Sequence, residues 1–296
     1  MDIGTELIKG IYDLHVHSAP DLLPRKVDDI DMAQLCIKTG MAGFASKSHF
    51  FCTAERAKIV NKMFPECREI GTICLNNSVG GINPIAVEMA GRAGTRLVWF
   101  PTCDAKWERD YAEKEQGKRA FWAQIVDDLA AEGIEMPGIS ILDEKGELKT
   151  CVYEVLDVIK KYSMVLCTGH ISHEETFKLV KAAHDKGIDR ILITHVTFPS
   201  TFYTVDEQRE LIAMGAYMEQ AYSTYSTGKV DFQTVVDQIK AVGPEHYVLG
   251  SDLGQSVRIS PELGMQEFVK DLYNAGFTAE EIYTMGHVNS EKLINV

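Results

Sequence analysis

The chain has 296 residues, a formal net charge of −13 and a hydrophobic fraction of 45%. This negative charge argues against nucleic acid or an anionic membrane as the main partner. No apolar run approaches the roughly 20 residues that a membrane-spanning helix requires, and the first ten residues lack the apolar core of a secretory signal. The seven cysteines form no Cys-x-x-Cys pair, so we expect reduced thiols in a cytoplasmic protein.

Short apolar segments alternate with longer helical patterns along the chain. The short segments are rich in Val, Ile, Leu and aromatic residues and carry little charge, as expected of strands buried on both faces. We predict eight strands, at residues 11–17, 42–47, 69–75, 96–100, 164–169, 190–194, 216–220 and 247–252. We predict nine helices, at residues 28–39, 53–63, 84–93, 121–132, 152–160, 173–186, 205–214, 232–241 and 265–275. Thr53 and Ser172 are expected to cap two of these helices, because acidic residues follow each of them in the first turn.

This alternation predicts an α/β fold, a closed (β/α)8 TIM barrel that forms a single domain over residues 1–296. An open doubly wound sheet is the alternative, but no Gly-x-Gly-x-x-Gly follows any predicted strand. Two segments interrupt the rhythm. Residues 102–119 are long and charged and are interpreted as a lid, and residues 137–150 predict a small β-hairpin insertion that turns at Lys145-Gly146. Residues 289–293 predict a short final helix.

The first predicted strand carries two histidines, His15 and His17, spaced by one residue. Side chains two residues apart in a strand point to the same face, so the two imidazoles would project together. Neutral imidazole is a good ligand for zinc, iron or nickel ions. The pair therefore predicts a metal site if later strands end in matching ligands.

Later strands do end in such residues, and the carboxyl ends of barrel strands form the active face of this fold. Candidates at or just beyond these ends are Lys47, His49, His170, His195 and Asp252. Five of the nine histidines thus fall at strand ends, which predicts a shared metal centre. Structural roles are expected for His173, His184, His246 and His287.

In these motifs the chain resembles the amidohydrolase superfamily of metal-dependent barrels, over nearly its whole length. The matching pieces are Asp13-Leu14-His15-Val16-His17, His170, His195, Gly250-Ser251-Asp252 and the ending Asn289-Ser290-Glu291-Lys292-Leu293. It is most similar to small, uncharacterised members. The resemblance implies that His15, His17 and Asp252 bind one metal ion. It further implies that His170 and His195 bind a second ion, or that His195 orients the nucleophilic water.

The resemblance also implies a metal-dependent hydrolase with one or two divalent ions, Zn²⁺ first and Mn²⁺, Fe²⁺ or Ni²⁺ as alternatives. Such an ion lowers the pKa of bound water to roughly 7. Asp252 would then take the proton of the water and pass it to the leaving group. The expected reaction is cleavage of a C–N or C–O bond in an amide, cyclic amide, lactone or ester.

The sequence departs from the family at the fourth strand, where a bridging Lys or a bridging Glu is expected and neither is present. Lys47 is interpreted either as a carboxylated bridging ligand or as a charged group that binds substrate anions, because an unmodified lysine would be repelled by two cations. His49 shares the face of Lys47 and is a candidate ligand or substrate contact. Glu219 is a carboxylate in a buried strand, which is costly unless it is paired, so we place it near the site as a substrate contact.

Loop residues suggest the substrate. Arg25 and Arg258 are candidate substrate-binding cations, residues 80–81 are a candidate anion site before a helix, and residues 198–203 and 222–225 supply aromatic side chains. We expect a small, anionic or amide-bearing molecule as the partner of a cytoplasmic enzyme, and a homo-oligomer is left open.

Three alternatives remain. A metal phosphoesterase of the polymerase-and-histidinol-phosphatase type also starts with His-x-His, but it adds an Asp-x-His where this chain has Asp252-Leu253-Gly254. A decarboxylase related to the amidohydrolases uses the same ligands. A non-catalytic metal-binding protein is less expected, because a structural zinc site is closed by four ligands and needs no base such as Asp252.

Overall fold

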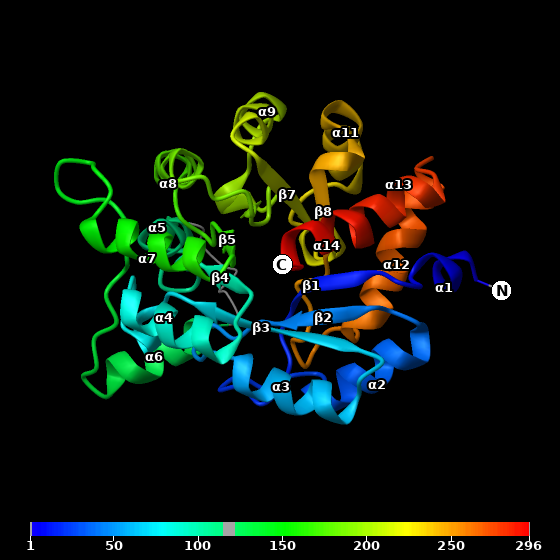
Figure 1. Cartoon of the computed structure of the whole chain (residues 1–296), viewed down its shortest axis with the longest axis horizontal. Helices are drawn as coiled ribbons and strands as arrows, with labels where there is room; N and C mark the ends of the chain where they lie inside the picture. Colours follow the sequence, from blue (N-terminus) through cyan, green and yellow to red (C-terminus); the bar gives the residue numbers. More distant parts are fainter. Residues whose placement is uncertain (1, 115–121, 296) are drawn as a thin grey trace.

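The computed structural model describes residues 2–114 and 122–295, and it shows eight parallel strands arranged in chain order around a barrel (Figure 1). All eight predicted strands are confirmed. They are β1 (Tyr12–Val16), β2 (Gly43–Ser46), β3 (Arg68–Cys74), β4 (Leu97–Trp99), β5 (Val165–Cys167), β6 (Ile191–Ile193), β7 (Ala216–Ala221) and β8 (Tyr247–Gly250).

The barrel closes where the end of β8 returns to β1. Val16 forms a parallel bridge with Leu253. The backbone N–H of His17 donates to the Leu253 carbonyl at 2.8 Å, and the N–H of Asp252 donates to the His15 carbonyl at 2.9 Å. The closure therefore brings the residues that follow β8 directly against the histidines of β1.

Helices surround the sheet and confirm the predicted βα alternation (Figure 1). Each of the nine predicted helices has a counterpart, and further helices occur at the termini and within two loops. The α-helices are α1 (Ile3–Leu7), α2 (Asp29–Thr39), α3 (Ala54–Met63), α4 (Pro84–Ala93), α5 (Lys106–Lys114), α6 (Ala123–Ala131), α7 (Thr150–Lys161), α8 (His173–Asp185), α9 (Val205–Ala213), α10 (Tyr222–Ser226), α11 (Phe232–Val242), α12 (Pro261–Asn274), α13 (Ala279–Tyr283) and α14 (Asn289–Ile294). Short helical turns are η1 (Asn77–Val79), η2 (Pro199–Thr201), η3 (Pro244–His246) and η4 (Thr284–Val288).

Alternate strand residues belong to two apolar cores. Leu97 and Trp99 of β4 belong to the smaller cluster, which gathers such side chains from most strands, while Val98 belongs to the larger cluster with the helices. Both faces of each strand are therefore buried, which explains the continuous apolar runs in the sequence.

One of the two predicted helix caps is present. Ser172 and Glu175 form a reciprocal capping box at the start of α8. Thr53 makes no cap bond. Its Oγ1 donates to the Ser46 carbonyl at 2.7 Å and accepts the N–H of Thr72 at 2.7 Å, so it joins β2 to β3 instead.

The two interrupting segments differ in part from their predictions. The segment predicted as a lid contains helix α5, and its residues 115–119 lie outside the described residues, as does residue 121 of the predicted 121–132 helix. The predicted hairpin is reduced to one antiparallel bridge between Leu142 and Leu148 around a turn at Gly146. Within the described ranges, no helix is both long and apolar enough to cross a bilayer.

A substitution at Gly169, just after β5, tests how tightly the backbone packs at the carboxyl ends of the strands. The φ of Gly169 is +67°, and an added Cβ would lie 2.3 Å from the Phe100 carbonyl oxygen and 2.5 Å from that of Pro101. We expect Gly169→Ala to lower the free energy of unfolding by about 3 kcal/mol or more, because backbone strain adds to the overlap.

The matched control is Gly215→Ala, at φ +88° with no atom within 4 Å of the added Cβ. It should cost only about 1–2 kcal/mol from the left-handed backbone. Urea unfolding of both variants measures the difference, and equal losses would contradict the proposed overlap at Gly169.

Candidate metal centre

The end of β1 and the residue after β8 bring two imidazoles onto one carboxylate. The Nε2 atoms of His15 and His17 lie 3.3 Å and 3.2 Å from Oδ1 of Asp252. Asp252 has φ +50°, a left-handed conformation that is rare for a residue with a side chain. The other carboxylate oxygen of Asp252 accepts a hydrogen bond from Ser223 Oγ at 2.7 Å. The structure thus gathers three of the predicted ligands at one point.

These histidines are neutral near pH 7. Burial is the main cause that lowers the pKa of His17, to about 3, with the charge of Arg25 acting in the same direction. Burial also lowers the pKa of His15 and His195 well below the usual value. Neutral imidazole is the form that binds a metal ion.

Positive charge at this point keeps Asp252 ionised. Burial by itself would raise its pKa, but the protonated forms of His15 and His195 and a proton donated by His17 lower it well below the usual value. When the imidazoles are neutral, as metal ligands must be, a bound cation would supply that positive charge instead.

The tautomer of His17 determines whether its contact with the Asp252 carboxylate is attractive or repulsive. Its Nδ1 lies 3.0 Å from the Lys47 carbonyl, which can only accept, so Nδ1 carries the proton. In a neutral ring, Nε2 then presents a lone pair to Asp252 Oδ1 at 3.2 Å. Two electron-rich atoms at this distance repel each other unless a cation lies between them.

Lys47 occupies the same point from the end of β2. Its side chain is completely buried, and Nζ lies 2.8 Å from His15 Nε2 and 5.2 Å from the centre of the Trp99 ring. Lys47 is therefore part of the candidate centre and is not a surface lysine.

Glu219 of β7 lies behind the histidines. Its Oε1 accepts a hydrogen bond from His15 Nδ1 at 2.9 Å, and its Oε2 accepts the backbone N–H of His195 at 3.1 Å and lies 3.3 Å from His195 Nδ1. Burial raises the pKa of this carboxyl group. Its side chain is fully buried, and it is not among the described residues that line the cavity.

His170 and His49 flank the centre. The ring of His170 is 5.2 Å from that of His195, and its Nδ1 lies 3.3 Å from Glu108 Oε2. The ring of His49 is 4.8 Å from that of His17, and its Nδ1 lies 2.8 Å from Thr102 Oγ1.

A cavity of about 120 Å³ opens onto this centre. Its described lining residues are His17, Leu23, Arg25, Lys47, His49, Glu108, Trp122, His170, His195, Phe198, Lys229, Asp252 and Gln255. Of the four predicted substrate contacts, His49 and Arg25 line the cavity, whereas Glu219 lies behind it. Arg258 is exposed in the loop after β8 and is not among the described lining residues, although Gln255 of the same loop is.

Arg25 is held in place by Asp21, whose Oδ2 accepts from Nε at 2.8 Å and from Nη2 at 2.6 Å. Phe198 is the aromatic residue of the predicted 198–203 segment that lines the cavity. The predicted 222–225 and 80–81 segments do not contribute to the described lining.

The sequence did not identify Glu108, Trp122, Lys229 and Gln255 as lining residues. Glu108 lies in α5, a segment in which charged residues predominate, so no single glutamate stands out in the sequence. Trp122 and Lys229 lie in loops without a recognisable motif.

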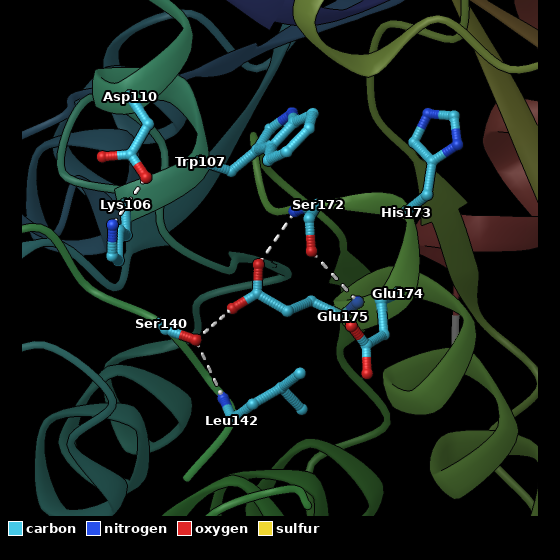
Figure 2. A pocket seen from close by; sticks show the side chains of 9 residues that line it. All are labelled: Lys106, Trp107, Asp110, Ser140, Leu142, Ser172, His173, Glu174 and Glu175. Carbon is cyan, nitrogen blue, oxygen red and sulfur yellow. Dashed lines mark hydrogen bonds and ion pairs between the residues drawn. The ribbon is translucent and has the colours of Figure 1, made fainter. Parts of the chain in front are cut away.

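A second, larger pocket of about 680 Å³ lies beside α5 and the start of α8 (Figure 2). Its charged side chains have partners within the pocket or beside it. Glu175 accepts from Ser140 Oγ at 2.6 Å and from the Ser172 N–H at 2.9 Å, and His173 Nδ1 lies 2.9 Å from Glu207 Oε1. Lys106 pairs with Asp110 at 2.5 Å. These groups therefore maintain the local structure and do not point to a ligand.

The residues of the first cavity fit a divalent ion. Ligand atoms of His15, His195 and Asp252 all lie within 4.8 Å of one another. The buried Nε2 of His170 has no hydrogen-bond partner among the described residues. Imidazole nitrogen together with carboxylate oxygen is the donor set that zinc prefers in catalytic sites.

Residues 10–219 match a family described as "Family of unknown function (DUF6282)", and the chain belongs to this family. No curated protein matches the chain.

Several solved structures share the fold. An amidohydrolase from Pseudomonas aeruginosa is 9% identical, with 98% of each chain covered and a TM-score of 0.65. A probable dipeptidase from the same organism is 10% identical, with 98% of this chain and 96% of the other covered and a TM-score of 0.64. A lactonase from Listeria monocytogenes is 9% identical, with 99% and 96% covered and a TM-score of 0.58. At these identities the likeness shows the (β/α)8 fold that the amidohydrolase resemblance predicts.

The low pKa of His17 predicts an effect of pH on the metal-free protein. The unfolded chain binds a proton at His17 below about pH 6.5, while the folded chain does not until about pH 3, so stability from this residue falls as pH is lowered between these values. From pH 7 to pH 5 wild type should lose about 2 kcal/mol relative to His17→Gln.

The comparison with the variant is needed because burial raises the pKa of Asp13 to about 7 and that of Glu69 to about 8. These acids act in the opposite direction and are common to both proteins. Urea unfolding of chelator-treated protein at both pH values measures the effect. A stability difference between the two proteins that does not change with pH would contradict the assignment.

Proposed function

We propose that this DUF6282 protein is a metal-dependent hydrolase that cleaves a C–N or C–O bond of a small anionic substrate with metal-activated water. The observation that carries the proposal is the contact of two neutral imidazoles with the Asp252 carboxylate at the base of a cavity. Structural neighbours named as an amidohydrolase, a probable dipeptidase and a lactonase support it.

The residues that would hold the metal follow from the donor set. His15, His17 and Asp252 would bind one ion, and His170 and His195 would bind a second. When bound, a divalent ion supplies a Lewis acid and lowers the pKa of water to roughly 7. Zinc is the first candidate because the ligands are imidazoles and a carboxylate.

Asp252 is the proposed catalytic base. Its depressed pKa keeps it deprotonated before reaction, and Ser223 fixes one of its oxygens at 2.7 Å. It would accept the proton of the nucleophilic water and donate it to the leaving nitrogen or oxygen. Since Asp252 lines the cavity, a bound substrate reaches it directly.

The cavity wall suggests the substrate class. Arg25 and Lys229 supply positive charge, and the Lys229 ammonium lies 4.1 Å from the centre of the Phe198 ring. Leu23, Trp122 and Phe198 supply apolar surface. A compact molecule with an anionic group and an apolar part fits this lining, and we propose a small-molecule partner in the cytoplasm.

Asp252→Asn tests the base. With zinc in excess, we expect turnover to fall by about 100-fold or more, because the amide cannot accept the proton. The control is Asp189→Asn, whose side chain is 92% exposed, and which should match wild type. The assay is a screen of lactones, amides and phosphoesters with metal-loaded protein.

Unchanged turnover of Asp252→Asn would reject the base. Wild-type protein that holds less than about 0.2 ion per chain, with no rescue by zinc or manganese, would reject the metal-dependent reaction as a whole.

Variants of Lys47 test whether the centre holds one metal ion or two. Its ammonium lies 2.8 Å from a nitrogen that must bind metal, and a positive charge there repels an incoming cation. We infer that the neutral amine of Lys47 adds to carbon dioxide, forms an N–C bond and releases one proton, which gives an anionic carbamate. Lys47→Met should then hold one ion fewer than wild type, and Lys47→Glu should recover part of that loss because it restores a carboxylate.

Metal analysis of the three proteins measures this effect, together with the carbamate signal of protein prepared in ¹³C-labelled bicarbonate. The same metal content in wild type and Lys47→Met, without a carbamate signal, would instead assign Lys47 to the binding of substrate anions.

A further inference from the structure

We propose that Glu219 is a positioning residue of the metal centre, which holds His15 of β1 and His195 after β6 so that both present their free nitrogens to the metal centre. This inference rests on the proposed function, since it requires that these histidines bind metal. Strand β7 thus contributes to the centre through Glu219, although Glu219 is not among the described residues that line the cavity.

The partners of Glu219 set it apart from other buried acids. The hydrogen bonds and ion pairs of its carboxylate within the described part of the chain all go to His15 and His195. In contrast, Asp13 accepts the backbone N–H groups of His15 and Ser251. A fully buried carboxylate is costly without partners, and the partners of Glu219 come from β1 and from the segment after β6.

The contact decides which nitrogen of His15 is free. Because Nδ1 of His15 donates to Glu219 Oε1 at 2.9 Å, a neutral ring carries its lone pair on Nε2. That Nε2 is the atom 3.3 Å from Asp252 Oδ1. A carboxylate that binds the far nitrogen of a ligand histidine fixes the ring orientation and raises its basicity.

His195 is held by the same carboxylate at two points. Oε2 accepts its backbone N–H at 3.1 Å and lies 3.3 Å from its Nδ1. His195 has φ +52°, so its backbone is in a strained left-handed conformation that the N–H contact stabilises. The rings of His15 and His195 stack with centroids 4.7 Å apart, as expected when one carboxylate holds both.

The neighbouring strand leaves room for this arrangement. An added Cβ at Gly250 of β8 would lie 3.0 Å from the Cβ of His15 and 3.2 Å from Glu219 Oε1. Glycine at this position therefore lets the carboxylate and the imidazole meet.

The test is zinc binding by chelator-treated protein, measured by titration calorimetry, with the visible spectrum of the Co²⁺-loaded protein as a second readout. Glu219→Gln offers one acceptor oxygen and an amide NH₂, so it cannot accept from both histidines. We expect its zinc Kd to rise about 10- to 100-fold and the Co²⁺ spectrum to change. Glu219→Asp keeps the charge and should give an intermediate Kd.

The matched control is Glu262→Gln, a buried glutamate of α12 that accepts from Ser260 Oγ at 2.7 Å, and its Kd should equal that of wild type. A Kd for Glu219→Gln within about twofold of wild type would overturn the inference and leave the proposed function intact. If Glu219→Gln does not fold, an unchanged Kd for Glu219→Asp would overturn it in the same way. Wild-type protein that binds no zinc would reject both proposals.

Discussion

The contact between Asp252 and the imidazoles of β1 is the constraint on which the site depends. The Lys47 carbonyl fixes the proton of His17 on Nδ1, and Glu219 fixes that of His15 on Nδ1, so both Nε2 atoms face a carboxylate with their lone pairs. At His17 such a contact is unfavourable beside an ionised acid, whereas at His15 the lone pair of Nε2 also has Lys47 Nζ as a donor at 2.8 Å. A bound cation converts the same arrangement into a ligand set, which is why the geometry favours a metal centre.

The fold places these groups together through the closure of the barrel. Backbone hydrogen bonds between β1 and the residues after β8 set His15 and Asp252 side by side. These segments are far apart in the sequence: Ser251, the residue before Asp252, is 236 positions from His15. The left-handed backbone at His195 and Asp252 costs free energy at two positions of the same site. Strain of this kind is retained when the surrounding structure requires it, and here both strained residues face the cavity.

The sequence predicted the barrel and the members of the centre, because both depend on local patterns. Each strand is an apolar run, and each candidate ligand stands at the end of such a run, as His15 and Asp252 do. The role of Glu219 could not be predicted. The alternation of side chains along a strand tells which face of the sheet a residue lies on, but not whether its side chain reaches the cavity or lies behind another side chain. Arg258 was placed at the site only because its loop follows a strand, and Glu108 was missed because it lies in a long charged segment whose folding depends on tertiary contacts.

The most direct measurement is the anomalous scattering of zinc-soaked crystals, recorded on both sides of the zinc absorption edge. We predict a peak between the Nε2 atoms of His15 and His17 and Oδ1 of Asp252, at roughly 2.0–2.2 Å from each. A zinc ion bound only elsewhere on the molecule, or no peak in crystals of folded protein, would contradict it.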